Sequence, residues 1–452
     1  MCCVAVSAAA GSAHASGFST ARFGGEHGYP VTFNPTAVYY NPAAIAESEG
    51  YHVFVDGSIA FRTASYDHSR APSDTVEPAG AAGANTGKAT LFNIAAAPMI
   101  GATGKFGDFA LGLAWYVPFG GSSEWSKDDD WLDQKTFAGP YDGEQRWYSI
   151  SGTLRAMYWT LDAAYKIPKT GLSLGVSGSL IRAEVKTIRA RNANGSDEVL
   201  GEGRSLIDVG DWAWGFGVGA TYEFIPKKLF AGLSYTSRPN VAGGMALDGV
   251  LVNNFGGSRA ETPIDFHQDL PDIVRLGARW KVRDNVELRL HGDWSRWSSM
   301  ENQCLVPDNA DDCPVEANGA ATPNTPGDQQ PLQNLPRDWQ DAFGVRAGGS
   351  FFVSPMLEVF AGLGYDSNAI PDESLDPALT DFHDISAALG GRVTIGKHLG
   401  VAASWTQFFY FSRDTNGKSI NANYQPPSTG PDAGGKYTQR IGVLNINVEA
   451  MF

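Results

Sequence analysis

The sequence predicts an all-β protein: a fourteen-stranded antiparallel transmembrane β-barrel whose lumen is plugged by an N-terminal hatch. Strand-length segments with alternating polarity recur along the chain, and the links between them are alternately short and long. No apolar run reaches the ~18 to 20 residues that a membrane-spanning helix requires. Aromatic residues make up 12% of the chain and glycines number 53, which suits many short strands, aromatic girdles and tight turns.

The clearest alternating segment begins at Val286. Aliphatic, aromatic and glycine positions (Val286, Leu288, Leu290, Gly292, Trp294) alternate with polar positions (Glu287, Arg289, His291, Asp293, Ser295). Four ionisable side chains on one face of a strand do not suit a soluble core. In a barrel they face a wet lumen while the other face contacts lipid.

The links between the segments predict the strand count. Tight links are expected at Ala102 to Gly107, Pro168 to Gly171, Pro226 to Lys228, Arg283 to Asn285, Ser354 to Pro355 and Gly396 to His398. Long links are expected near 69–87, 121–145, 190–210, 248–261, 303–337, 368–381 and 414–436. Thirteen connections join fourteen strands, and this even number places both ends of the barrel on the periplasmic side. Phe266 to Val282 is counted as part of one strand, with a bend at Leu270-Pro271.

The last residues, from Leu444 to Phe452, alternate between two faces as a strand requires. Since a closed barrel joins its first and last strands, we expect this segment to pair with the strand that begins near Tyr51. The tripeptide Asn41-Pro42-Ala43 comes just before that first strand. We therefore expect the closing seam and the hatch to be neighbours.

The chain is expected to divide into three parts: a signal peptide at residues 1–15, a hatch at 16–50 and the barrel at 51–452. Ala13-His14-Ala15 has the small-x-small pattern of an export cleavage site, although no Lys or Arg precedes Arg22. A disordered Ala-rich leader is the alternative for the first part. The net charge of -15 argues against nucleic acid as a partner.

Cys304 and Cys313 remain once the leader is removed, and in an oxidising envelope compartment this pair predicts a loop disulfide, with free thiols as the alternative. No metal site or cofactor is expected. The acidic residues at 128–130 match no calcium-binding spacing and are interpreted as a solvated loop. The chain contains no catalytic constellation and is not expected to be an enzyme.

Several motifs resemble those of the FadL-type outer-membrane transporters of long-chain fatty acids and other hydrophobic compounds. They occur in family order over nearly the whole chain: Ser16-Gly17-Phe18, Asn41-Pro42-Ala43, Val117-Pro118-Phe119-Gly120, Gly232-Leu233-Ser234-Tyr235, Leu270-Pro271-Asp272 and Trp294-Ser295-Arg296-Trp297. The resemblance implies a hatch that ends at Asn41-Pro42-Ala43, an outer capture site, a tighter inner site and release through a lateral opening in the third strand.

Pro118 and Gly120 are the candidates for the kink at this opening. Phe109, Leu111, Leu113, Trp115 and Val117 form the expected lipid-facing row of the third strand, and Pro118 and Gly120 then interrupt it. Proline removes a ladder donor and glycine permits a bulge, so a wall defect is expected here. An ordinary bulge at the barrel rim is the alternative.

Two arginines are candidates for holding a ligand carboxylate. Arg189 resembles a basic carboxylate-binding position of the family, and Arg337 lies near a second one. Arginine suits this task because its fork can bind a carboxylate through two hydrogen bonds. A lumen arginine is, however, more often paired with an acidic neighbour. Apolar loop residues are the candidates for the outer capture site: Trp131, Leu206, Val250, Leu251 and Phe255.

These features predict a monomeric uptake channel of the bacterial outer membrane, whose partners are a hydrophobic ligand and outer-membrane lipids including lipopolysaccharide. A general aqueous porin is the alternative, disfavoured by the hatch. A lipid hydrolase built on His291 and Ser295 is disfavoured because both side chains project into the lumen on the expected register.

Overall fold

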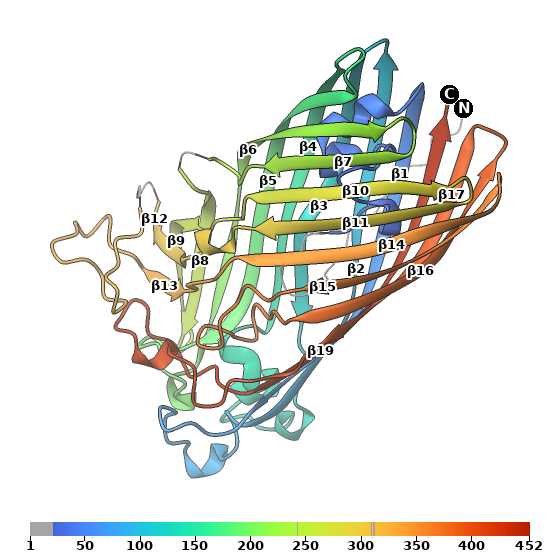
Figure 1. The fold of residues 1–452 in the computed structure, drawn as a ribbon. Helices are drawn as coiled ribbons and strands as arrows, with labels where there is room; N and C mark the ends of the chain where they lie inside the picture. The colour runs from blue at the N-terminus through green and yellow to red at the C-terminus, as the bar shows by residue number, and fades with distance from the viewer. Residues whose placement is uncertain (1–20, 242, 309, 311) are drawn as a thin grey trace, which may run out of the picture.

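Fourteen strands form a closed antiparallel barrel in the computed structural model, which describes residues 21–241, 243–308, 310 and 312–452 (Figure 1). The wall follows chain order: β1 (Tyr51–His68), β2 (Gly87–Phe106), β3 (Phe109–Glu124), β4 (Ser151–Lys166), β5 (Leu172–Arg191), β6 (Gly203–Ile225), β7 (Leu229–Thr236), β10 (Ile273–Arg283), β11 (Val286–Ser295), β14 (Ala342–Ser354), β15 (Leu357–Asp366), β16 (Asp384–Ile395), β17 (Leu399–Tyr410) and β19 (Lys436–Met451). The predicted strand number is confirmed.

The barrel closes where β19 pairs with β1. The ladder runs from His52 opposite Met451 to Asp67 opposite Lys436. Beyond it, Tyr51 and Phe452 exchange two backbone hydrogen bonds of 3.1 and 2.9 Å. The expected pairing of the first and last strands is therefore present, and the barrel has no open edge at this seam.

Side chains of the wall alternate between lipid and lumen as the pattern at Val286 predicted. On β1 every second residue from His52 to His68 is buried or half-buried inside, whereas Tyr51, Val53 and Val55 are exposed outside. On β11, Leu288 and Leu290 face outward while Glu287 and Arg289 are buried in the lumen. Among the described residues, no helix is long and apolar enough to cross a membrane.

Four further strands extend the sheet beyond the barrel at the end that carries the long loops (Figure 1). They are β8 (Ala246–Phe255), β9 (Ser258–His267), β12 (Asn302–Pro307) and β13 (Gln333–Pro336). Residues Gly217 to Ile225 of β6 pair with β7, and residues Arg204 to Val209 of β6 pair with β8. The single strand expected over 266–282 is wrong: β9 ends at His267, and Leu270-Pro271 belongs to the connection before β10 because proline cannot donate to a ladder.

The remaining elements are short. The described part of the chain before β1 contains η1 (Gly25–His27), α1 (Ala37–Tyr40) and η2 (Pro42–Glu47). The long loops contain η3 (Ala79–Ala81), η4 (Asp129–Trp131), η5 (Gly139–Asp142), η6 (Glu144–Trp147), η7 (Val199–Gly201), η8 (Trp297–Ser299), β18 (Arg413–Asp414) and η9 (Asn421–Asn423). The expected signal peptide and Ser16-Gly17-Phe18 lie outside the described residues.

Candidate functional site

The segment from residue 21 to residue 50, called the hatch below, lies inside the barrel and is held there through Asn41. The Nδ2 atom of this side chain donates to the carbonyl oxygens of Pro30 (2.9 Å) and Ala220 (3.1 Å). Its Oδ1 accepts the amide of Ala43 at 3.1 Å, which caps η2 with Pro42 at the first helical position. One fully buried side chain thus ties two parts of the hatch to β6.

Glycines on the inner wall leave the space that this tripeptide occupies. A Cβ on Gly219 of β6 would lie 2.0 Å from Oδ1 of Asn41, and one on Gly175 of β5 would lie 2.4 Å from the amide nitrogen of Ala43. These two glycines are direct cross-strand partners. A real Cβ cannot approach so closely, so the hatch sits in this position only because the wall lacks side chains there. Sequence reasoning missed this seat, since glycines were interpreted as turn residues.

The other end of the hatch is held by polar contacts to strands across the lumen. Arg22 pairs with Asp366 at 2.5 Å, and Nε2 of His27 lies 2.9 Å from Oε1 of Glu358. The amide of Gly24 donates to Asp56 of β1 at 2.9 Å. The hatch therefore contacts the closing seam through Gly24. The tripeptide Asn41-Pro42-Ala43, which was expected at the seam, lies against β5 and β6 instead.

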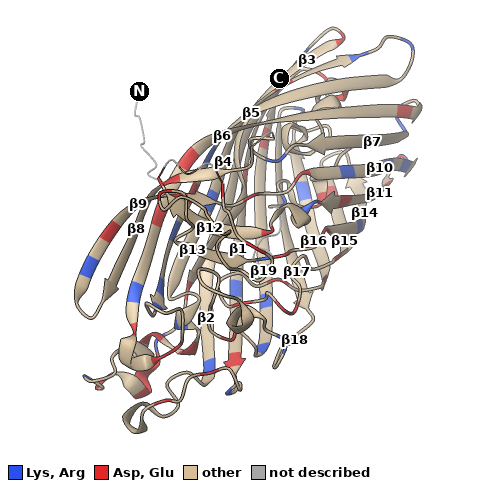
Figure 2. Cartoon of the chain, turned by 90° about the vertical axis from the view of Figure 1, so that its left-hand side faces the viewer, with Lys and Arg blue, Asp and Glu red and all other residues tan. Residues whose placement is uncertain are grey.

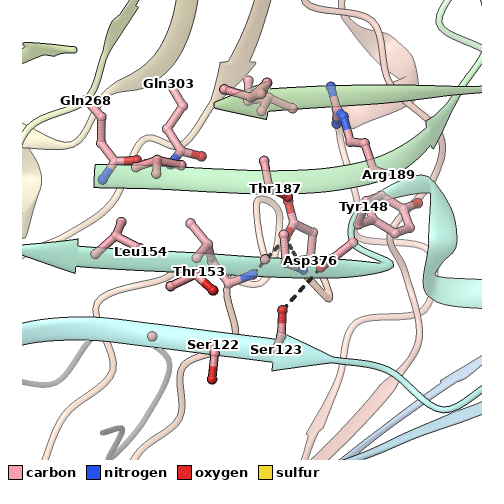
Figure 3. A pocket seen from close by; sticks show the side chains of 18 of the residues that line it. Ser122, Ser123, Tyr148, Thr153, Leu154, Thr187, Arg189, Gln268, Gln303 and Asp376 are labelled. Atoms are coloured by element: carbon pink, nitrogen blue, oxygen red, sulfur yellow. Dashed lines mark hydrogen bonds between the residues drawn. The ribbon is translucent and has the colours of Figure 1, made fainter. Parts of the chain in front are cut away.

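A cavity of about 100 Å³ lies beneath the long loops, beside the upper part of β3 (Figure 3). Its apolar lining comes from Phe119, Leu154, Val185, Ile207, Phe266, Leu335, Ala378 and Leu379, and its polar lining includes Arg62, Tyr148, Arg189, Gln268, Gln303, Arg337 and Asp376. An apolar cavity of about 150 Å³ binds benzene. This cavity is smaller, so it has room for a head group, would admit a single ring only if its lining moved slightly, and has no room for a long chain.

The cavity brings together both predicted carboxylate-binding arginines, but they differ in their partners. Arg337 is buried and paired with Asp376 at 2.6 Å, and it also donates to Gln303 at 2.8 Å. Arg189 has no hydrogen-bond or ion-pair partner for its side chain among the described residues, and its Nε is shielded from solvent. Figure 3 shows it on the opposite side of the cavity from Gln268 and Gln303. Of the two predicted arginines, Arg189 is therefore the guanidinium left available to an anionic group; Arg62, which also lines the cavity, donates to the uncharged Gln439 and Thr380.

The wall is interrupted between β2 and β3 next to this cavity. Their ladder ends at Met99 opposite Tyr116, and the next pairing is an isolated bridge between Leu91 and Trp125. Between these points the described backbones form no ladder with each other. Asn93 crosses the interval with its Nδ2, which donates to the carbonyl of Ser122 at 2.6 Å. We call this interval the wall gap.

Two prolines stand at the lower end of the wall gap. The backbone amide of Lys105 donates to the carbonyl oxygen of Gly50, which lies on the β1 side. Because backbone groups alternate sides along a strand, the odd-numbered residues of β2 direct their amides toward β1 and the even-numbered residues direct theirs toward β3. The nitrogen of Pro98 therefore faces β3. Pro98 thus has no donor at the point where the β3 ladder stops. On β3, Val117 and Pro118 both lie opposite Met157, which makes a bulge.

The bulge turns the upper part of β3 into the barrel. Val117 is buried, so its expected place in the lipid-facing row is wrong: the bulge reverses the alternation after Tyr116. Phe119 and Gly120 line the cavity, and Phe119 packs edge-on against Trp297 inside the loops. The carbonyl of Pro118 accepts the amide of Ala21 at 2.9 Å, which joins the hatch to the kink. Hatch, wall gap and cavity therefore form one contiguous region.

The five residues suggested for outer capture do not meet in one place. Leu206, Val250, Leu251 and Phe255 lie in β6 and β8 rather than in loops, since the ladder continues above the barrel. Leu251 is buried in the main core. Trp131 lies in the loop after β3, packed against Ala81 and Ala84.

The loops above the cavity are joined by covalent and polar links. A disulfide connects Cys304 in β12 to Cys313, with Cα atoms 6.1 Å apart. Asp372 accepts from Nε of Arg413 at 2.9 Å and from Lys418 at 2.6 Å. Carboxylate oxygens of Asp248, Asp265 and Asp308 gather within 4.8 Å of one another on the outer strands.

Comparisons with known proteins agree with this architecture. A protein of Neisseria meningitidis serogroup B that is described as an outer membrane protein is 22% identical over 438 residues, which cover 92% of this chain and 90% of that protein. Among solved structures, a Pseudomonas aeruginosa FadL homologue has a TM-score of 0.73 at 16% identity and covers 98% of this chain and 100% of its own. The P. putida toluene transporter TodX has a TM-score of 0.62 at 15% identity, with 93% and 94% covered.

The family model that matches residues 1–450 is that of the outer membrane protein transport proteins OMPP1/FadL/TodX. These proteins are transport channels for hydrophobic compounds rather than enzymes. The match spans nearly the entire chain and agrees with the closed barrel and its internal hatch. The protein therefore belongs to the OMPP1/FadL/TodX family and is an outer-membrane transport protein.

Proposed function

We propose that the protein takes up amphipathic hydrophobic molecules, with long-chain fatty acids as the first candidate, and releases them sideways through the wall gap. The observation that carries this proposal is that residues 119–123 of β3 line the cavity and also border the gap. A ligand in the cavity lies next to an interval of wall without ladder hydrogen bonds. Transfer of apolar surface out of water favours its capture by ~25 cal/mol per Å² buried.

The unpaired guanidinium of Arg189 supports a ligand that carries a carboxylate. An anionic head group would gain charge-assisted hydrogen bonds there without competing with an acidic side chain. Arg337 supports the site indirectly, because its charge is already shared with Asp376. The small volume of the cavity implies that only the head group enters it at first, while the chain extends toward the wall gap or the loops.

Neutral hydrocarbons are the second candidate class. Toluene is the ligand named for TodX of P. putida and TbuX of Ralstonia pickettii, whose folds this chain shares. A monoaromatic ring would require the lining of the cavity of about 100 Å³ to move slightly, because a benzene-binding cavity has about 150 Å³. The apolar lining around Phe119 and Phe266 accepts either class, so Arg189 is the residue that separates them.

An equilibrium binding experiment on the purified full-length protein separates the candidates. We expect a long-chain fatty acid to bind more tightly than its methyl ester and than toluene, and the protein to show little steady ion conductance in planar bilayers. Equal binding of acid and ester would favour the hydrocarbon class. A large steady conductance would favour the aqueous porin, which the seated hatch disfavours. We also propose that lipopolysaccharide contacts the outer rim of the barrel.

A further inference from the structure

A groove of about 520 Å³ lies on the outer face of β4, β5 and β6, above the lipid-facing part of the wall. Three basic side chains line it, Arg155, Arg182 and Lys186, together with three acidic ones, Glu184, Asp208 and Asp248. In the β4–β5 ladder Arg155 lies opposite Glu184, and Arg182 lies opposite Met157. The basic groups therefore occupy neighbouring outward positions on two adjacent strands. Figure 2 shows red and blue bands on the strands labelled β8 and β9 at its left, at the end of the barrel that carries the long loops.

Tryptophans directly below the groove show its level in the membrane. Trp159 and Trp212 are exposed on the outer wall, and their ring centroids lie 5.5 Å apart. Arg182 is the ladder partner of Trp212, and its guanidinium carbon lies 5.8 Å from the centre of that ring. Exposed tryptophans gather where lipid head groups meet the hydrocarbon layer. The groove therefore opens at the level of the head groups.

The hydrogen bonds within the groove leave donors unused. One carboxylate serves two arginines: Glu184 accepts from Arg155 at 2.6 Å and weakly from Arg182 at 3.5 Å. This triad carries one net positive charge, the separate pair of Lys186 with Asp208 is neutral, and Asp248 brings the formal charge of the lining to zero. The groove therefore offers a phosphate its free donors rather than a net positive charge. Nε of Arg155 is shielded from solvent and has no partner among the described residues. Each guanidinium offers five N–H donors, so most of them remain free.

The backbone of β6 makes room beside these arginines. Gly210 faces outward in the groove, and a Cβ at this position would lie 3.1 Å from a terminal nitrogen of Arg182. Any side chain there would crowd the guanidinium. The glycine thus keeps a hollow next to the triad, at the level of the lipid head groups.

We propose that this groove binds the phosphate of a phosphorylated glycolipid of the outer leaflet. The forks of Arg155 and Arg182 would hold the phosphate, Lys186 would add its charge, and the acyl chains would lie below along Trp159 and Trp212. Arg155 is also the ladder partner of Gly120 on the kinked part of β3. The bound lipid would therefore stand beside the wall gap. The inference rests on the proposed contact of lipopolysaccharide with the outer rim, and it is independent of the transported ligand.

Titration of purified full-length protein with bisphosphorylated lipid A in detergent tests the site. We expect the double variant Arg155→Gln with Arg182→Gln to bind at least tenfold more weakly than the unchanged protein. Arg259→Gln is the matched control, because Arg259 is an exposed arginine outside the groove that is also ion-paired, with Glu261 at 3.1 Å. It should bind as the unchanged protein does. Glu184→Gln should bind more tightly, since it removes the competing carboxylate.

Two further arms identify the ligand. The unchanged protein should bind dephosphorylated lipid A about as weakly as the double variant binds lipid A. Millimolar inorganic phosphate should not displace lipid A from the unchanged protein. The proposal is overturned if the double variant stays within twofold of the unchanged protein, if dephosphorylated lipid A binds equally well, or if inorganic phosphate alone saturates the groove. Folding is checked by heat-modifiable migration in gels. Fatty acid binding should be unchanged in the double variant, so a failure of this site is separate from a failure of the transport proposal.

Discussion

The carboxamide oxygen of Asn41 occupies the place where a side chain on Gly219 would begin, 2.0 Å from an ideal Cβ. The same Asn41 side chain donates to the carbonyl of Ala220, one residue along β6. The hatch is therefore held against β6 in two ways: Asn41 fills the space that a side chain at position 219 would occupy, and it donates a hydrogen bond to Ala220. This relationship fixes the position of the tripeptide more strictly than apolar packing would.

Gly219→Ala should unseat the hatch without opening the barrel wall. The added methyl group displaces Asn41, and overpacking of this kind costs about 1 to 3 kcal/mol of folding stability. We expect a steady ion conductance in planar bilayers at least several-fold above that of the unchanged protein. Gly178→Ala is the control, since a Cβ there meets nothing within 4 Å. If both variants conduct equally, the glycine seat does not hold the hatch.

Arg189→Gln and Arg337→Gln should have opposite consequences. Because Arg189 has no side-chain partner in the part of the chain that the structure describes, its replacement should weaken fatty acid binding about tenfold or more while the unfolding transition changes little. Replacing Arg337 leaves Asp376 buried without its partner, which costs on the order of 3 to 5 kcal/mol. Isothermal titration and thermal unfolding measure the two effects. A stability loss at Arg189 with unchanged binding would contradict its assigned role.

Acid should loosen the loops above the cavity. Burial raises the pKa of Asp372, but hydrogen bonds from Lys418 and Arg413 outweigh it and hold the pKa below the ordinary 3.8. Because its pKa is lower in the folded protein, the ionised Asp372 stabilises the contact with Lys418 and Arg413 at pH values above 3.8. This stabilisation is lost as the pH falls below that value. Spin labels on Glu373 and Asn416 should separate as pH falls below 3.8. In Asp372→Asn they should be apart already at pH 7; a distance independent of both pH and substitution would refute the link.

Alternation and link length were enough to predict the barrel, because every wall strand faces lipid on one side and a wet lumen on the other. The pattern at Val286 and the turn at Gly396 are local consequences of that environment. The alternation of polar and apolar residues could not predict β8 and β9, because strands above the membrane face water on one side and loops on the other. Leu206 and Val250 were therefore placed in loops.

The bulge at Val117 and Pro118 was predictable because proline carries its own backbone chemistry, whereas Gly120 lies beyond the bulge in regular pairing with Arg155. Pro98 was missed: only the ladder register shows that its nitrogen faces β3. Gly219 was missed for a related reason, since an inward glycine acquires meaning only when a distant segment occupies the space beside it. Both arginines line the cavity, and their carboxylate-binding role stays a prediction; the difference between them depends on Asp376, which comes from a loop far along the chain.

A reversible cross-link between β2 and β3 across the wall gap tests most directly the claim that the ligand leaves sideways through this gap. Asn93 Nδ2 lies 3.3 Å from Oγ of Ser122, so cysteines at these two positions lie close enough to be tied by oxidation or by a short bis-methanethiosulfonate cross-linker, both of which a reductant reverses. The measurement is uptake of radiolabelled long-chain fatty acid by cells that carry Asn93→Cys with Ser122→Cys. Asn93→Cys alone, with and without reductant, controls for the native Cys304 to Cys313 bond. Lateral release predicts that uptake falls to background when oxidised and returns on reduction; full uptake by the oxidised, cross-linked protein would contradict it.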